Sequence, residues 1–207
     1  MPLTRDKIIA AAVAMADEGG LKALSMRKLA ASLDVEAMSL YNHVQNKDDV
    51  LGGMVEAVVG AIRVPFEGAT WKEQLRVRCV GARAMLVAHP WAAALLVSRV
   101  NDGPNLFRYV DATLGCLRQA GFSWPEVDAA WNTLDSFVYG YTLQELNFPI
   151  PDDSYAETAA AYQDLVPETI YPNLSRMSDQ VMTGAYDGKV PFEYGLQLIL
   201  DGLERKT

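Results

Sequence analysis

Apolar residues recur with helical spacing along most of the chain, and alternating β-branched runs are few. Thr4 precedes the first apolar stripe, which stops at Gly19-Gly20, and this pattern predicts a capped helix of about 15 residues. Ser25 is placed to cap a second helix, on which Leu29 occupies the buried face. The chain therefore begins with two helices in close succession.

Two more helices are predicted directly after these. The second helix must end near Asp34, and a third short helix is expected from Glu36 to Val44, with Leu40 on its buried face. Asn46 then caps a fourth helix that extends to Ile62. Its early glycines, Gly52-Gly53, weaken it locally, since each costs about 1 kcal/mol relative to alanine.

The remainder of the chain is also helical in pattern. Thr70 opens the capping box TWKE, and Gly103-Pro104 marks the start of another helix. A long amphipathic helix is predicted from Trp124 to Asn147, and a last one from Pro191 to Arg205. Residues 152–189 carry only weak helical signals. The predicted fold class is all-α.

Composition limits where the chain can act. Half of the residues are hydrophobic and 21% are charged, yet no apolar run approaches the roughly 18 residues of a membrane helix. The start, MPLTRDKII, lacks the features of a secretory signal, so we expect a cytoplasmic protein with no membrane partner. Cys79 and Cys116 lie far apart without metal-ligand spacing, so they are interpreted as small buried hydrophobes.

The negative charge is unevenly distributed. The net charge is −8, with −1 in residues 1–50 and −7 in residues 51–207. Such a balance argues against indiscriminate coating of nucleic acid, because that binding depends on neutralising phosphates. The segment from Ser25 to Lys47 is the least acidic, and it is where a specific anion-facing site is expected.

The stretch SLYNHVQNKDDV gives that segment its chemistry. Two short helices joined by a tight turn form a helix-turn-helix pattern, whose second helix enters the DNA major groove. Tyr41, His43 and Lys47 can then bind phosphate oxygens, and Arg27 can bond both acceptors of a guanine edge. The alternative is that Tyr41 packs in the small N-terminal core while His43 is merely solvated.

Other function classes fit the sequence less well. GxSxG, HExxH, CxxC and a phosphate-binding glycine loop are all missing, so we expect neither an enzyme nor a bound cofactor or metal. A helical module that binds a small molecule but no DNA is the stronger rival. That rival predicts that Arg27→Ala and Tyr41→Phe leave the activity unchanged.

Residues 4–62 resemble the DNA-binding domain of the TetR transcriptional regulators, through TRDKIIAAAVAMADEGG, LSMRKLAASLDV and SLYNHVQNKDDV. The later stretches WKEQL, GFS, DSFVYGYTLQE and FEYGLQLILDGLE resemble the tetracycline-repressor branch. The resemblance implies an all-α homodimer that acts as a repressor, binds a double-stranded DNA operator and releases it when a small-molecule effector binds. It implies a helix-turn-helix domain in residues 1–46, a connecting helix in 47–63 and an effector-binding and dimerisation domain in 64–207.

The resemblance also implies roles for particular positions. The residues placed against bases or the groove are Arg27, Ala37, Met38, Ser39 and Tyr41, and those placed against phosphates are His43 and Lys47. Asp34 stands where the family usually has glycine, but aspartate tolerates a left-handed backbone, so the turn should survive.

The effector is less well defined. Tetracycline repressors hold drug and magnesium with two histidines, but the matching positions here are Ala61-Ile62-Arg63 and Leu96. We therefore expect no metal-chelated tetracycline, and His89 is expected to be a buried, hydrogen-bonded core residue. The candidate pocket residues, any of which could instead be core or surface, are Arg78, Arg83, Met85, Leu96, Trp131, Asp135 and Tyr139. An inward arginine would favour an anionic effector unless Asp135 neutralises it.

Dimerisation and coupling follow from the helices. Residues 124–147 and 191–205 expose more apolar surface than a monomer needs, and Gly140, Gly195 and Gly202 permit close approach of backbones. Pairing them with a second copy would give a four-helix interface and a palindromic operator, although both helices could instead pack within one chain. The fourth helix would transmit the effector signal because it joins both domains.

Overall fold

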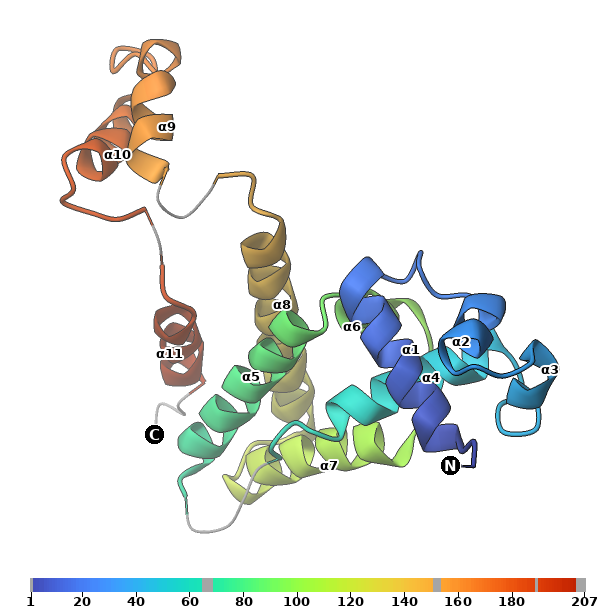
Figure 1. Ribbon diagram of the computed structural model, residues 1–207. Coiled ribbons are helices and arrows are strands. Elements are labelled where there is room, and N and C mark those ends of the chain that lie inside the picture. Colours follow the sequence, from blue (N-terminus) through green and yellow to red (C-terminus); the bar gives the residue numbers. More distant parts are fainter. Residues whose placement is uncertain (1, 65–68, 151–153, 189, 204–207) are drawn as a thin grey trace. The chain divides into compact units, whose positions relative to one another are not determined.

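The computed structural model describes residues 2–64, 69–150, 154–188 and 190–203, and every regular element within them is helical (Figure 1). This confirms the predicted all-α class. By their contacts the described residues form two compact units, one of residues 2–146 with 199–203 and one of residues 147–198. The helices of the first part are α1 (Arg5–Gly19), α2 (Met26–Ser32), α3 (Ala37–Leu40), α4 (Lys47–Val59), α5 (Trp71–Ala88), α6 (Trp91–Ser98), α7 (Pro104–Gln119) and α8 (Trp124–Asn147).

The predicted caps define the N-terminal helices. The side chains of Thr4, Ser25 and Asn46 each accept a hydrogen bond from the backbone N–H three residues later, at 3.3, 3.3 and 2.9 Å. Gly20 ends α1 with a positive φ of 66°, a conformation that glycine adopts without steric cost. A small core is formed by buried residues of these helices and the adjoining turns, namely Ile8, Ala12, Leu24, Leu29, Leu40 and Val44.

The third helix is shorter than predicted. It was expected to extend to Val44, but α3 ends at Leu40, and the chain continues in hydrogen-bonded turns. The N–H groups of His43 and Val44 both bond to the carbonyl of Leu40, so Val44 is still buried. The buried face was therefore predicted correctly while the helix length was wrong.

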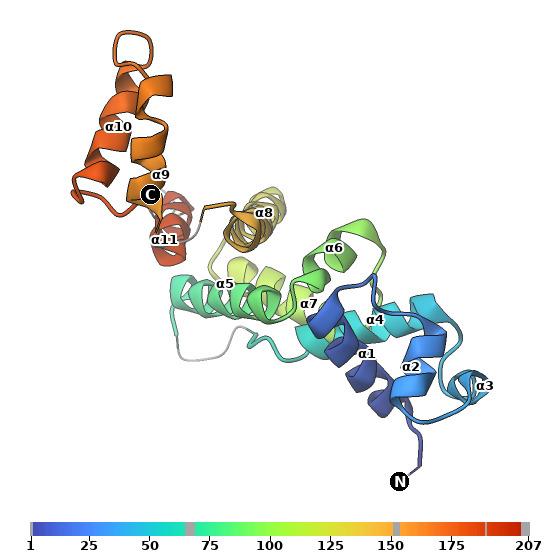
Figure 2. The same cartoon turned by 45° about the horizontal axis from the view of Figure 1, so that its top comes forward.

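Helix α4 passes from the N-terminal helices to α7, as both ribbon views show (Figures 1 and 2). It packs against α1, α6 and α7. Its buried side chains are Val50, Met54, Val55, Val58 and Val59. This burial fixes α4 between the N-terminal helices and the rest of the first unit.

The chain breaks sharply between α5 and α6. His89 ends α5 in a non-helical conformation, and Pro90 follows, where a ring in place of the N–H prevents the helix from continuing. No single helix in the described ranges is long and apolar enough to cross a membrane. Helices α5 and α6 reach the length and hydrophobicity of a membrane span only when they are taken together, and they are bent by 114° relative to each other.

The larger helices match their predicted signals closely. Thr70 caps α5, Gly103-Pro104 begins α7, and α8 has the predicted bounds.

Cys79 and Cys116 are free, buried thiols, which confirms their interpretation as small hydrophobes. Burial raises the pKa of Cys116 to about 11, so this thiol stays protonated and unreactive near neutral pH.

The second unit contains α9 (Tyr155–Ala161), the 3-10 turn η1 (Gln163–Leu165) and α10 (Pro172–Met182). Helices α9 and α10 pack against each other, yet none of their described residues is buried. The large apolar side chains that this unit leaves exposed include Tyr162, Leu165, Ile170, Tyr171, Leu174 and Met177. The last helix, α11 (Phe192–Gly202), crosses the boundary between the units and buries Phe192, Leu196 and Leu200.

Candidate functional site

The polar side chains predicted to meet DNA lie on the outside of α2, α3 and the turn that follows. Arg27 and His43 are exposed, Met38 is 75% exposed and Tyr41 is 44% exposed. Ala37 and Ser39 are half-buried on the same short helix. The exposure of Tyr41 contradicts the alternative in which it packs into the N-terminal core.

The turn between α2 and α3 has the backbone predicted for it. Asp34 has φ of 54°, and it is the one non-glycine residue with a positive φ in the described ranges. The N–H of Val35 returns to the carbonyl of Ala30 at 3.1 Å, which closes the turn. Aspartate thus occupies the left-handed position that usually favours glycine, as expected.

Lys47 connects the start of α4 to the segment that precedes α2. Its Nζ donates a hydrogen bond to the carbonyl of Leu24 at 2.9 Å, while its side chain remains exposed. The ammonium is therefore held beside the N-terminus of α2, where a phosphate could also be bound. This intramolecular contact was not evident from the sequence.

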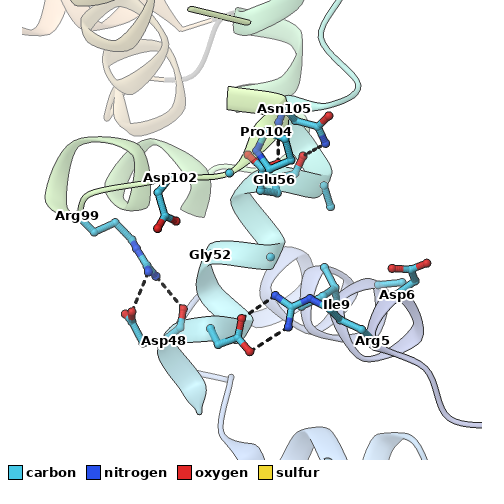
Figure 3. A pocket seen from close by; sticks show the side chains of 15 residues that line it. Arg5, Asp6, Ile9, Asp48, Gly52, Glu56, Arg99, Asp102, Pro104 and Asn105 are labelled. Carbon is cyan, nitrogen blue, oxygen red and sulfur yellow. Dashed lines mark hydrogen bonds and ion pairs between the residues drawn. The ribbon is translucent and has the colours of Figure 1, made fainter. Parts of the chain in front are cut away.

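The first turn of α4 carries two carboxylates, and each is paired with an arginine (Figure 3). Arg5 binds both oxygens of Asp49, at 2.6 and 2.9 Å, and this hydrogen bonding holds the pKa of Asp49 below its ordinary value. Arg99 donates to the carboxylate of Asp48 at 2.9 Å and to its carbonyl at 3.2 Å. These pairs offset the acidic charge at the start of α4, beside the exposed Lys47.

Glu56 connects α4 to the first turn of α7 (Figure 3). One carboxylate oxygen accepts the N–H of Asn105 at 2.8 Å, and the other accepts the N–H of Leu106 at 3.0 Å. Those N–H groups have no partner within their own helix, so a carboxylate from α4 caps α7. The groove around these contacts has a volume of about 620 Å³ and lies among α1, α4 and the α6–α7 connection.

A second cavity, of about 660 Å³, lies among α6, α7 and α8. Four of the predicted pocket residues line it, namely Leu96, Trp131, Asp135 and Tyr139. The lining residues that the sequence did not single out include Asn101, Leu106, Phe107, Tyr109, Val110 and Leu114. Its size is typical of small-molecule sites.

Arg78 lies behind this cavity rather than in its wall. Its side chain is fully buried, with Nη2 at 2.6 Å from Asp135 Oδ1 and Nε donating to Thr113 Oγ1 at 3.1 Å. The guanidinium also lies 4.4 Å from the ring centre of Tyr109. Asp135 therefore neutralises the arginine, which was one of the two predicted alternatives.

Burial and negative charge keep the neighbouring phenols neutral. Burial raises the pKa of Tyr139 above its ordinary value, and Asp135 raises it further. The pKa of the fully buried Tyr109 is raised well above its ordinary value, again mainly by burial. Tyr139 can thus donate a hydrogen bond from the cavity wall at neutral pH.

The other candidate positions lie elsewhere. Arg83 pairs with Glu145 on the surface, and Met85 is buried without lining the cavity. His89 was expected in the core, but its side chain is 25% exposed, and its Nδ1 lies 2.8 Å from Asp17 Oδ1. The prediction of a hydrogen bond was right and the prediction of full burial was wrong, because the residue sits at the exposed break between α5 and α6.

Known proteins share both parts of this arrangement. Residues 8–54 match the family model for bacterial regulatory proteins of the tetR family, and residues 64–207 match the tetracyclin repressor-like C-terminal domain. An HTH-type transcriptional regulator of Saccharopolyspora erythraea is 36% identical over 202 residues, which cover 97% of this chain and 84% of the relative.

Solved structures agree with this assignment. ActR of Streptomyces coelicolor in complex with actinorhodin has a TM-score of 0.82 and 31% identity, covering 98% of this chain and 95% of ActR. BioQ with its double-stranded DNA operator has a TM-score of 0.67 and 26% identity, covering 98% of both chains. The chain therefore belongs to the TetR family of bacterial transcriptional regulators, with a helix-turn-helix DNA-binding part and a tetracycline-repressor-like C-terminal domain.

Proposed function

We propose that this protein represses transcription in the cytoplasm by binding a palindromic operator as a homodimer, and that a small molecule in the α6–α8 cavity releases it. Two related structures support the two halves of this proposal, since BioQ is bound to an operator and ActR to actinorhodin. We assign the DNA-binding part to residues 1–46, the connecting helix to 47–63 and the effector and dimer part to 64–207.

Leu106 connects the effector cavity to α4, the helix that joins the DNA-binding part to the rest of the chain. Leu106 lines the effector cavity, and its backbone N–H donates to Glu56 on α4 at 3.0 Å. Arg99, at the start of the α6–α7 connection, binds Asp48 at the first turn of α4. An occupant that displaces this connection and the first turn of α7 therefore acts directly on both ends of the helix that carries the DNA-binding part.

The thermodynamic consequence is reciprocal. If the occupied cavity favours an α4 position in which the recognition helices no longer fit the operator, bound operator must weaken effector binding by the same factor. The exposed ion pairs of α4 can rearrange at small cost, because surface pairs typically contribute about 0–1 kcal/mol. The α6–α7 connection is thus suited to two alternative positions relative to α4.

On the DNA-binding face, we assign base reading to Arg27 and phosphate binding to His43 and Lys47. The groove-facing residues are Ala37, Met38, Ser39 and Tyr41. Their mixture of apolar and hydroxyl groups suits methyl contacts and single hydrogen bonds rather than bidentate readout.

We assign the dimer interface to α8 and α11. Leu143 and Leu146 on α8 and Tyr194 and Leu198 on α11 are exposed apolar side chains. A Cβ built on Gly140 would meet no described atom within 4 Å, so its surface is open to a partner. Burying these side chains against the same helices of a second copy gives the twofold symmetry that a palindrome requires.

The effector we propose is not a magnesium-chelated tetracycline. The positions that match the chelating histidines hold Ala61-Ile62-Arg63 and Leu96. Leu96 lines the cavity and offers only an apolar surface there.

Selection of bound duplexes from a random-sequence library tests the proposed function. The expected result is an enriched palindrome whose half-sites lie about one helical turn apart or somewhat more. Arg27→Ala should lose the enrichment, whereas Arg176→Ala, which removes an exposed arginine of α10, should retain it. Recovery of unrelated sequences with the wild type would instead support a small-molecule module without operator binding.

A further inference from the structure

The charge of the α6–α8 cavity limits the effectors it can hold. Among the described lining residues none carries a positive charge, whereas Asp111 and Asp135 contribute two carboxylates. Arg78, the nearby cation, is fully buried behind Asp135 and engaged by Thr113 and the ring of Tyr109. An anionic occupant would therefore meet carboxylates before it could reach the guanidinium.

The cavity walls are aromatic. Phe107, Tyr109, Trp131 and Tyr139 line it together with aliphatic side chains from α6 and α7. Flat rings bind well between such walls, because stacked and edge-to-face arrangements add to the burial of apolar area. The volume of about 660 Å³ accommodates a molecule of several fused rings.

Polar atoms in the lining define where hydrogen bonds are available. Trp131 Nε1 and Asn101 Oδ1 are buried and have no hydrogen-bond partner among the described residues. Buried polar atoms are normally paired, so a donor and an acceptor left unsatisfied in one cavity indicate a ligand that supplies both. Asp135 Oδ1 faces Arg78, which leaves Oδ2 as a further acceptor.

We infer that the effector is an uncharged or cationic fused-ring aromatic molecule that donates hydrogen bonds to Asp135 and Asn101 and accepts one from Trp131, and that anionic aromatics are excluded. This inference rests on the proposed function of the cavity but names its ligand class. Of the two possibilities that the sequence left open, an arginine that binds an anionic effector and an arginine neutralised by Asp135, it favours the second.

Calorimetric titration of the DNA-free protein with three matched three-ring probes tests this. The probes are the aminoacridine cation, neutral anthracenemethanol and anionic anthracenecarboxylate. The cation and the neutral alcohol should each bind at least about tenfold more tightly than the anion. Equal or tighter binding of the anion, or no binding of any probe, would overturn the inference.

Two variants locate the effect at Asp135. Asp135→Asn leaves Arg78 without its counterion, so the preference should shift toward the anion, and Arg78→Met/Asp135→Asn should shift it to a much smaller extent. The double variant also keeps the test usable if the single variant folds poorly. An unchanged preference in Asp135→Asn, or a shift in the double variant as large as that in the single variant, would place the selectivity elsewhere and contradict the role of Asp135. Operator selection in the absence of ligand is independent of these titrations, so failure of the ligand class and failure of DNA binding are separable.

Discussion

Two ion pairs in this protein have the same shortest distance and different environments. Arg5 and Asp49 approach to 2.6 Å at the junction of α1 and α4, with side chains 45% and 23% exposed. Arg78 and Asp135 also approach to 2.6 Å, but Arg78 is fully buried and Asp135 is 17% exposed. Distance alone therefore does not rank them, because the cost of losing one partner depends on how well water can replace it.

The difference in burial between the ion pairs of α4 and the Arg78–Asp135 pair suits them to different roles in a ligand-controlled switch. The exposed pairs of α4 can break and re-form as the helix moves, which suits the part that must release DNA. The buried pair cannot be exchanged cheaply, and it fixes the charge and shape of the effector cavity. A switch of this kind needs a fixed recognition site and a connection that rearranges easily.

The largest effect is expected when the buried pair is broken. Asp135→Asn should lower the free energy of unfolding by about 3 kcal/mol, because it leaves an uncompensated buried guanidinium. Urea denaturation measures this loss, and Arg78→Met/Asp135→Asn should recover most of it. A loss no greater than that of Arg5→Met would show that burial does not separate the two pairs.

Removing the carboxylate that caps α7 should have the next largest effect. Glu56→Ala frees the N–H groups of Asn105 and Leu106, at an expected cost of about 2 kcal/mol in urea denaturation. Glu36 supplies a control, since it lies at the N-cap of α3 but makes no side-chain capping bond. Equal losses for Glu56→Ala and Glu36→Ala would remove the basis for coupling through this contact.

Alanine substitution at the two adjacent glycines of α4, Gly52 and Gly53, is expected to change the stability in opposite directions. A Cβ on Gly53 would lie 2.5 Å from Cδ1 of the buried Ile9, whereas one on Gly52 meets only Arg99 at 3.7 Å. Gly52→Ala should stabilise the protein by up to about 1 kcal/mol in thermal unfolding. Gly53→Ala should destabilise it by about 1 kcal/mol, since overpacking exceeds the gain in helix propensity. Stabilisation by both would show that the α1–α4 contact yields easily.

The smallest effect concerns the exposed pair and pH. Arg5 lowers the pKa of Asp49 from its ordinary 3.8, so the pair stabilises the fold above that pH and loses its effect as pH falls through the lowered value. The unfolding free energies of the wild type and Arg5→Met should differ by less than about 1 kcal/mol near neutral pH. Denaturation at a series of pH values should show that difference vanishing in acid. A difference that grows in acid would contradict this assignment.

Local chemistry explains which features could be predicted from the sequence. Thr4, Ser25 and Asn46 cap helices through bonds that reach only three residues along the chain, so residue type and spacing predict them. The left-handed turn at Asp34 is local as well. The end of α3 was missed because the buried positions Leu40 and Val44 suit either a helix or successive turns.

Long-range contacts could not be predicted in this way. Glu56 meets Leu106 fifty residues later, and Arg78 meets Asp135 on another helix. Gly103-Pro104 signals a helix start that needs a partner for its N–H groups, but no local pattern indicates which carboxylate supplies it. Four of the seven candidate positions line the cavity, and its other lining residues were missed for the same reason, since helical spacing gives a face and only packing shows what that face meets.

Sequence-specific DNA binding is tested by fluorescence anisotropy of a labelled duplex of the selected operator, titrated with the wild type and with Arg27→Ala at several salt concentrations. We expect tight wild-type binding at physiological salt and a loss of about 1–3 kcal/mol in the variant, with the salt dependence nearly unchanged because a base contact is removed. Indistinguishable affinities of the two proteins, or equal wild-type affinity for an unrelated duplex, would contradict a sequence-specific regulator that reads DNA through α2 and α3.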